Sequence, residues 1–200
     1  MGENPIQVLI YVVLAVYVLH LYRTEYRKRT ATAELDTSLP GATACVGSVY
    51  AYAVIGALAI LALETGGEIA LGIVAVQSQV YAYSVFAALA AGVIEEVIFR
   101  GYLVVDNRGR RLLWAGCFAM SLLFALIHAH LWSFEGGFHW VLNTKSFFTT
   151  GILFVNSLWF YAIRFMPLNR ERSLFPCMLA HAISNLGVYG IKGFQGFVIF

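Results

Sequence analysis

Charged residues are scarce in this 200-residue chain, of which only 12% are Asp, Glu, Lys or Arg. Soluble globular domains carry about 25%, whereas 60% of this chain is hydrophobic. Blocks of like charge are also missing, so no segment resembles a nucleic-acid-binding patch. The composition therefore excludes an ordinary soluble domain and indicates a polytopic membrane protein.

Cysteine is rare as well, with three residues in the whole chain. Cys45, Cys117 and Cys177 lie within apolar stretches and show no paired spacing. The sequence therefore predicts neither a disulfide framework nor a cysteine zinc motif. We expect all three to behave as small buried hydrophobic residues.

Six apolar segments are candidates for crossing a bilayer, at residues 6–22, 41–63, 80–105, 112–131, 146–165 and 174–189. The third is separated from residues 69–76 by the polar sequence Gln-Ser-Gln, because a helix over 69–105 would rise about 55 Å against a hydrocarbon core of about 30 Å. No internal repeat or linker divides the chain. We expect one all-α membrane domain over residues 1–200, with about six transmembrane helices from six to eight hydrophobic segments, around a polar intramembrane site.

The basic residues are distributed unevenly. Ten of the 13 Lys and Arg residues lie in the regions 23–39, 106–111 and 164–172, while Lys145 and Lys192 lie in the opposite connections. By the positive-inside rule, the basic loops face the cytoplasm and the N-terminus lies outside. We expect a multi-pass protein of a prokaryotic plasma membrane.

Two carboxylates and a guanidinium, those of Glu95, Glu96 and Arg100, interrupt the third segment. An ionisable side chain at the centre of a spanning helix costs roughly 2.5 to 3.5 kcal/mol on insertion scales, so such groups usually face a protein interior and mark function. Residues four apart share a helix face, so Glu96 and Arg100 can neutralise each other. Glu95 then lacks a fixed cation, and a buried carboxylate of this kind can take a proton from water. The alternative is a structural ion pair beside an acid without a role.

Polar side chains also interrupt the fourth and sixth segments, as Phe124-x-x-x-His128 and His181-x-x-x-Asn185. On a helix, Phe124 would pack beside His128 and fix its ring. His181 and Asn185 share a face and can donate together to one oxygen, as the stabilisation of an oxyanion requires. His128 alone is equally consistent with a histidine that holds two membrane helices together.

These motifs occur in a characteristic order, Glu95-Glu96-x-x-x-Arg100, then Phe124-x-x-x-His128, then His181-x-x-x-Asn185, on three separate hydrophobic segments. That order resembles the signature of the CPBP family. The family comprises the CAAX prenyl endopeptidases and the bacteriocin-processing and abortive-infection proteins, which are glutamate-type intramembrane proteases. The resemblance covers residues 80–185, which we expect to be the catalytic core.

The resemblance implies an intramembrane endopeptidase that hydrolyses a peptide bond of a membrane-associated substrate. By the resemblance, Glu95 and His128 would activate the hydrolytic water. His181 and Asn185 would form the oxyanion site.

The same resemblance gives Glu96 and Arg100 the task of shaping the site and supporting it electrostatically. The expected partners are a membrane-associated protein or peptide substrate and the lipid bilayer, with no nucleic acid. No cofactor and no metal is expected.

The depths in the membrane that the sequence predicts for these residues do not agree with one shared site. Measured along straight helices from the cytoplasmic boundaries, Glu95, His181 and His128 would lie about 15, 10 and 24 Å deep. Helix tilts averaging about 20° and boundary errors of a few residues would close part of this difference.

Four alternatives stay open from the residues alone. Glu95, His128 and His181 could bind zinc, although the chain lacks an HExxH motif. Cys177 and His181, four residues apart, could form a nucleophile and its base. A catalytically inactive immunity or scaffold protein would use the polar groups to hold helices together, and a transporter would use them to relay protons.

Overall fold

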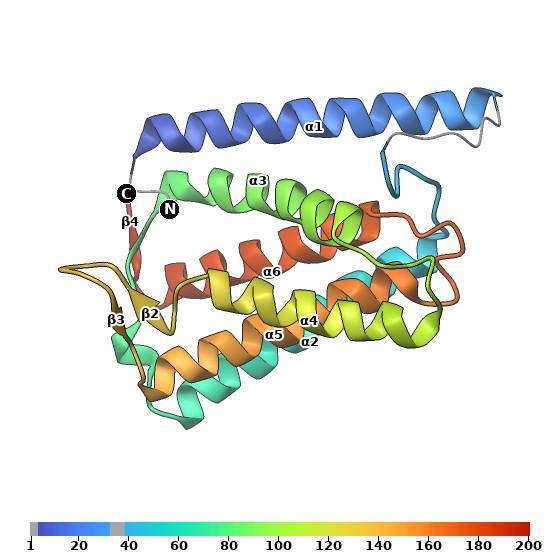
Figure 1. Cartoon of the computed structure of the whole chain (residues 1–200). Coiled ribbons are helices and arrows are strands. Elements are labelled where there is room, and N and C mark those ends of the chain that lie inside the picture. The colour runs from blue at the N-terminus through green and yellow to red at the C-terminus, as the bar shows by residue number, and fades with distance from the viewer. Residues whose placement is uncertain (1–3, 33–38) are drawn as a thin grey trace.

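The computed structural model describes residues 4–32 and 39–200, which are mostly helical. Six α-helices carry the architecture (Figure 1): α1 (Pro5–Thr32), α2 (Gly47–Ala70), α3 (Val85–Glu95), α4 (Arg110–Ile127), α5 (Thr144–Phe165) and α6 (Phe175–Phe194). The shorter helices are η1 (Val74–Val76), η2 (Ala82–Ser84) and the π-helix η3 (Glu96–Tyr102). Strand β1 (Val80–Tyr81) pairs in parallel with β4 (Val198–Ile199), and β2 (Trp132–Ser133) pairs antiparallel with β3 (His139–Trp140).

Five helical segments in this part of the chain are long and apolar enough to cross a membrane: Pro5–Ala31, Gly47–Ala70, Ala82–Tyr102, Arg110–Ile127 and Thr144–Phe165. The predicted fold class, an all-α polytopic membrane protein, is confirmed. The sixth predicted segment, 174–189, forms α6, which is not among these five candidates. α6 buries the polar residues His181 and Ser184 and packs against α2 and α5 in one hydrophobic cluster. Neighbouring helices, rather than lipid, therefore surround its polar side chains.

Several predicted boundaries are wrong. The sequence predicts one helix over 80–105, but the chain forms β1 first, enters α3 at Val85 and becomes the π-helix η3 at Glu96. The predicted segment 112–131 ends at Ile127, because Ala129 adopts φ +55°, which a continuing α-helix does not allow. The helix predicted over 6–22 continues to Thr32. Residues 33–38 of the predicted cytoplasmic loop lie outside the described residues.

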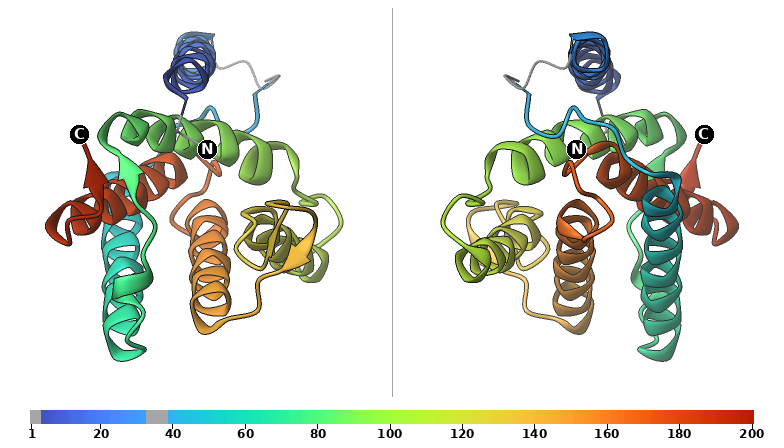
Figure 2. Two further views of the ribbon diagram at one scale, coloured as in Figure 1. Left: turned by 90° about the vertical axis from the view of Figure 1, so that its left-hand side faces the viewer. Right: turned by 90° about the vertical axis from the view of Figure 1, so that its right-hand side faces the viewer.

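The helices are inclined to one another. In Figure 1, α3 and α4 descend toward the right, whereas α2, α5 and α6 rise toward it. Helix α1 lies at the edge of the bundle (Figure 2) and packs on α3 where Ala15 meets Ala90 and Ile94. Two side chains that would lie at different depths on parallel helices can therefore meet where inclined helices cross.

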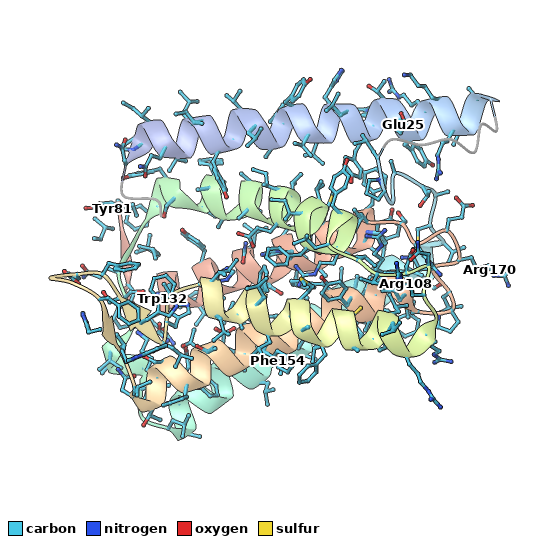
Figure 3. The ribbon with its side chains drawn as sticks, viewed as in Figure 1. Glu25, Tyr81, Arg108, Trp132, Phe154 and Arg170 are labelled. Carbon is cyan, nitrogen blue, oxygen red and sulfur yellow. The ribbon has the colours of Figure 1, made fainter. Side chains whose placement is uncertain are left out.

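The two ends of the molecule differ in chemistry. Figure 3 shows Arg108 and Arg170 at one end of the bundle and Tyr81 and Trp132 at the other. We call these the arginine end and the aromatic end. The arginine end holds the connections that the sequence places in the cytoplasm.

Close packing between α2 and α5 depends on a glycine. A Cβ atom at Gly56 would lie 2.1 Å from the ring of Trp159, far inside van der Waals contact. Small residues of this kind let membrane helices approach closely, and packing rather than hydrophobic exclusion drives helix association in lipid. Trp159 packs against the main hydrophobic cluster, which includes Ala53 and Ala57 from the same face of α2.

We expect Gly56→Ala to destabilise the bundle. The added methyl group forces the Trp159 ring to shift, and overpacking of this kind costs about 1–3 kcal/mol. Thermal unfolding in detergent measures the change as a lower Tm. Gly116→Ala in α4 is the matched control, because a Cβ there meets nothing within 4 Å. Equal effects of the two substitutions on Tm would contradict this account of the α2–α5 contact.

Candidate active site

Three segments that are distant in sequence bring an acid and two imidazoles together. Glu95 Oε2, at the end of α3, lies 3.9 Å from His128 Nε2 and 3.9 Å from His181 Nε2. The side chains of Glu95 and His128 are 22% and 29% exposed, whereas that of His181 is 8% exposed. A separation of 3.9 Å is too long for a direct hydrogen bond, and Glu95 Oε2 has no hydrogen-bond partner among the described residues.

His128 caps the last turn of α4. Its Nδ1 lies 2.6 Å from the backbone oxygen of Phe124, and the Phe124 ring lies 4.5 Å from the imidazole, centroid to centroid. A carbonyl oxygen only accepts hydrogen bonds, so Nδ1 carries the proton. In the neutral imidazole, Nε2 therefore presents its lone pair toward Glu95.

His181 is held from the opposite side. Its Nδ1 lies 2.9 Å from Glu96 Oε1, which also accepts a hydrogen bond from Arg100 Nη1 at 3.0 Å. The imidazole stacks on Phe160 with a centroid distance of 5.0 Å. A carboxylate paired with arginine accepts and does not donate, so His181 donates from Nδ1. The ring is thereby fixed with Nε2 directed toward Glu95.

Arg100 is fully buried among aromatic rings. Its guanidinium carbon lies 4.7, 4.9 and 5.1 Å from the ring centres of Phe124, Tyr161 and Phe160. Its Nη2 donates to Ser157 Oγ at 2.5 Å and to the Ser157 carbonyl at 3.2 Å. Cation–π attraction and charge-assisted hydrogen bonds together replace the lost hydration of the guanidinium.

The interpretation of the sequence missed two residues of this network. Ser157 Oγ donates to Ser121 Oγ at 3.0 Å, and both serines are fully buried, so the network joins α4 and α5 to Arg100. Both serines interrupt apolar segments, as the glutamates and histidines do. A search for every polar residue within the predicted spans would have included them.

The two neighbouring glutamates differ because the helix changes type between them. Glu95 is the last residue of α3 and Glu96 is the first of η3, in which the Leu103 N–H donates to Ile98 O, five residues back. Single π-helical turns inside α-helices are frequent at functional sites. Glu96 and Arg100 pair as the spacing predicts, and Glu95 faces the two imidazoles.

Asn185 makes a different contact. Its Nδ2 donates to the backbone oxygen of Ala88 in α3 at 2.6 Å. His181 donates to Glu96, so the two residues share no acceptor among the described residues. Their joint role at an oxyanion stays a prediction.

The cysteines do not form a reactive site. Cys177 is fully buried and its thiol donates to Phe160 O at 3.3 Å. Cys117 is buried as expected, but Cys45 is only partly buried. Desolvation raises the pKa of the Cys45 thiol, so it stays protonated at neutral pH and is a weak nucleophile.

The candidate zinc ligands lie near one another, but not in a metal-binding arrangement among the described residues. In residues 4–32 and 39–200, no set of three His, Cys, Asp or Glu side chains is arranged to hold a metal ion. Glu95, His128 and His181, the set that could bind zinc, come together around one oxygen instead.

The depth estimate from straight helices is wrong. It separates His128 from Glu95 by several ångströms along the membrane normal, yet the two side chains meet. The reason is the inclination of α3, which runs across the bundle in Figure 2 while α4 is seen nearly end-on, so that the two helix ends meet at Glu95 and His128.

We expect Ser157→Ala to lower the free energy of unfolding by about 1.5–3 kcal/mol, the value of a hydrogen bond to a charged group. The substitution removes the hydroxyl that joins Arg100 to Ser121. Chemical unfolding in detergent measures the loss. Ser184→Ala is the control, because Ser184 is also buried but its hydroxyl has only a long 3.5 Å contact, to the neutral Asn156. If both variants lose the same stability, Ser157 does not support the guanidinium.

Comparison with known proteins identifies the family. A family profile described as type II CAAX prenyl endopeptidase Rce1-like matches residues 77–187, more than half of the chain and a region that contains all six candidate residues. Searches of curated proteins and of solved structures found no match. The family match confirms the resemblance seen in the motifs. The chain belongs to the Rce1-like family of CAAX prenyl endopeptidases, which are membrane proteases.

Proposed function

We propose that this protein is an intramembrane endopeptidase that hydrolyses a peptide bond of a membrane-associated protein with a water molecule activated by Glu95 and His128. Family membership supports the reaction class. The observation that carries the mechanism is the oxygen Glu95 Oε2, which has no hydrogen bond among the described residues and lies 3.9 Å from each of two imidazole nitrogens.

We infer that a bridging water molecule joins Glu95 to His128 when the site is active. Two hydrogen bonds of about 2.8 Å, meeting at the water oxygen, span a gap of 3.9 Å. The water donates one hydrogen bond to Glu95 Oε2 and a second to His128 Nε2. As the water oxygen attacks the substrate carbonyl, its proton passes to Glu95, which acts as general base.

Collapse of the tetrahedral intermediate completes the reaction. The carbonyl carbon keeps the new bond to the water oxygen, and the C–N bond breaks. The proton held by Glu95 passes to the leaving amine, which restores the carboxylate for the next cycle.

His181 would serve the oxyanion through a proton on Nε2, because Nδ1 already donates to Glu96. Asn185 has a second N–H on the Nδ2 atom that donates to Ala88, and this N–H is available to the same oxyanion.

Location follows from the distribution of charge. We propose that the arginine end faces the cytoplasm of a prokaryotic cell, since most of the basic residues lie in the connections at that end. A membrane-associated substrate, such as a protein with a prenylated C-terminus, fits a family of prenyl endopeptidases.

A second function is favoured by one observation. His181 and Asn185 already donate to Glu96 and Ala88, as polar groups that only hold helices together would do. In a catalytically inactive immunity or scaffold relative, Glu95→Gln preserves the biological effect, because Glu95 Oε2 has no hydrogen bond to any residue that the structure describes. Loss of Glu96 or Arg100 would instead strand a buried charge and destabilise the bundle.

We expect Glu95→Gln to reduce turnover at least about 100-fold, because a positioned general base contributes about 10²–10⁴-fold. Cleavage of a farnesylated peptide ending in a CAAX sequence, in proteoliposomes, measures turnover. Glu135→Gln, the same change on the exposed 132–140 hairpin, is the matched control and should retain full activity. Unchanged cleavage by Glu95→Gln refutes the assignment, and no cleavage of membrane peptides by the wild-type protein favours the inactive relative.

We expect turnover to survive treatment with a zinc chelator, because Glu95, His128 and His181 are not arranged as a ligand set. Elemental analysis of protein purified without added metal should give far less than one zinc per chain. Stoichiometric zinc, together with activity that disappears on chelation and returns on zinc addition, would establish the zinc-dependent variant instead.

A further inference from the structure

The connection between α4 and α5 forms a hairpin of aromatic residues. Trp132 and Trp140 are paired across β2 and β3. The rings of Trp132 and Phe134 lie 5.4 Å apart, those of Phe134 and Phe138 lie 5.6 Å apart, and those of Phe138 and Trp140 lie 5.4 Å apart. The four rings form one continuous row, and we call this segment the aromatic hairpin.

The aromatic hairpin exposes most of its apolar surface. Phe134 is 70% exposed, Trp140 is 62% exposed and Phe138 is 56% exposed. Contiguous exposed apolar surface of this kind marks an interaction site. The bundle itself does not cover these rings.

The position of the aromatic hairpin matches a membrane interface. It lies at the aromatic end, opposite Arg108 and Arg170 (Figure 3), and projects beyond the ends of α4 and α5 (Figure 1). The 18 residues of α4 rise about 27 Å, close to the hydrocarbon thickness of about 30 Å. When the arginine end of α4 lies at one edge of the hydrocarbon, the hairpin lies at the other edge.

The exposed apolar surface of α4 continues onto the hairpin. The last turns of α4 expose Leu122, Leu123, Leu126 and Ile127. Near the start of α5, Leu142 and Phe147 are also exposed, at 63% and 57%. Because α4 and α5 are among the membrane-spanning segments, the lipid that covers them also reaches the hairpin.

We propose that the aromatic hairpin lies in the interfacial layer of the bilayer, with its rings among phospholipid headgroups and the first acyl carbons. Trp and other aromatic residues concentrate at this depth, where an apolar ring and a polar edge are both satisfied. The stacked pair Tyr81 and Tyr83 adds two phenols near the same end, with a centroid distance of 5.3 Å. This proposal is independent of any catalytic activity.

The aromatic hairpin also fixes the end of α4. Trp132 Nε1 donates to the Leu126 carbonyl at 3.0 Å, and Val141 N donates to Leu131 O at 2.8 Å. Leu126 is two residues before His128, so an anchor in the interface holds the depth of the helix end that carries this imidazole.

A spin label at Phe138→Cys tests the proposal in liposomes of neutral and anionic phospholipids. Cys45→Ala is the background, since Cys117 and Cys177 are 2% and 0% exposed and escape labelling. Collision rates with oxygen, which concentrates in lipid, and with a water-soluble nickel chelate report the surroundings of the label. Labels at Leu123→Cys, on the exposed face of α4, and Arg108→Cys, at the arginine end, are the lipid and water references.

We expect the ratio of oxygen to nickel collisions at position 138 to be several-fold higher than at position 108 and to approach that at position 123. A ratio equal to that at position 108 places the hairpin in water and overturns the proposal. A label that neither reagent reaches also overturns it, because a second copy or another protein then covers the hairpin. Phe134→Cys is the second label position, should Phe138→Cys not fold.

Discussion

A fully buried ion pair between Glu96 and Arg100 is the constraint that organises the core. Removing two charges from water costs several kcal/mol per ion, and their attraction offsets this cost only where further hydrogen bonds satisfy the remaining groups. Arg100 donates to Ser157 from α5 and contacts rings of α4 and α5, and Glu96 Oε1 accepts from His181 of α6. Arg100 Nε and Glu96 Oε2 have no hydrogen-bond partner among the described residues. Four segments must therefore hold their places together. In a lipid bilayer, apolar side chains gain little by moving from lipid to a helix contact. A polar cluster of this kind therefore determines how the helices pack.

The same cluster separates the roles of two adjacent carboxylates. Glu96 is completely buried and binds Arg100 and His181 through Oε1, whereas Glu95 is partly exposed. Each keeps its Oε2 without a hydrogen bond among the described residues, and that of Glu95 lies 3.9 Å from two imidazole nitrogens. The π-helix begins between them, so the division is built into the backbone. Different environments for neighbouring acids are a general way to assign one a chemical task and the other a structural one. His181 links the two, because it donates to Glu96 and faces Glu95.

Much of this was predictable from the sequence, and the exceptions have physical reasons. Charges and imidazoles are costly in apolar segments, so Glu95, Glu96 and His181 stood out, and the hydrophobic lengths predicted the helices. Ser157 did not stand out, because a serine hydroxyl can bond to its own helix backbone at little cost. The π-helix was not predicted because hydrophobic periodicity does not reveal a local change in backbone hydrogen bonding. The estimated depth of His128 was wrong because the estimate assumed parallel helices. The real inclination of the helices depends on packing between segments that are far apart in sequence.

The part of the chain outside the family match also bears on the site. α6 carries His181 but is not apolar enough to be counted among the candidate spans, so it depends on protein neighbours. α2, which precedes the matched region, supplies them: Val49, Ala53 and Ala57 are fully buried in the same cluster as the α6 residues Cys177 and Ala180. Small side chains on α2 let the two helices approach closely, which excludes lipid from that face of α6. The candidate site therefore depends on α2 to cover α6, although none of the candidate residues lies on α2.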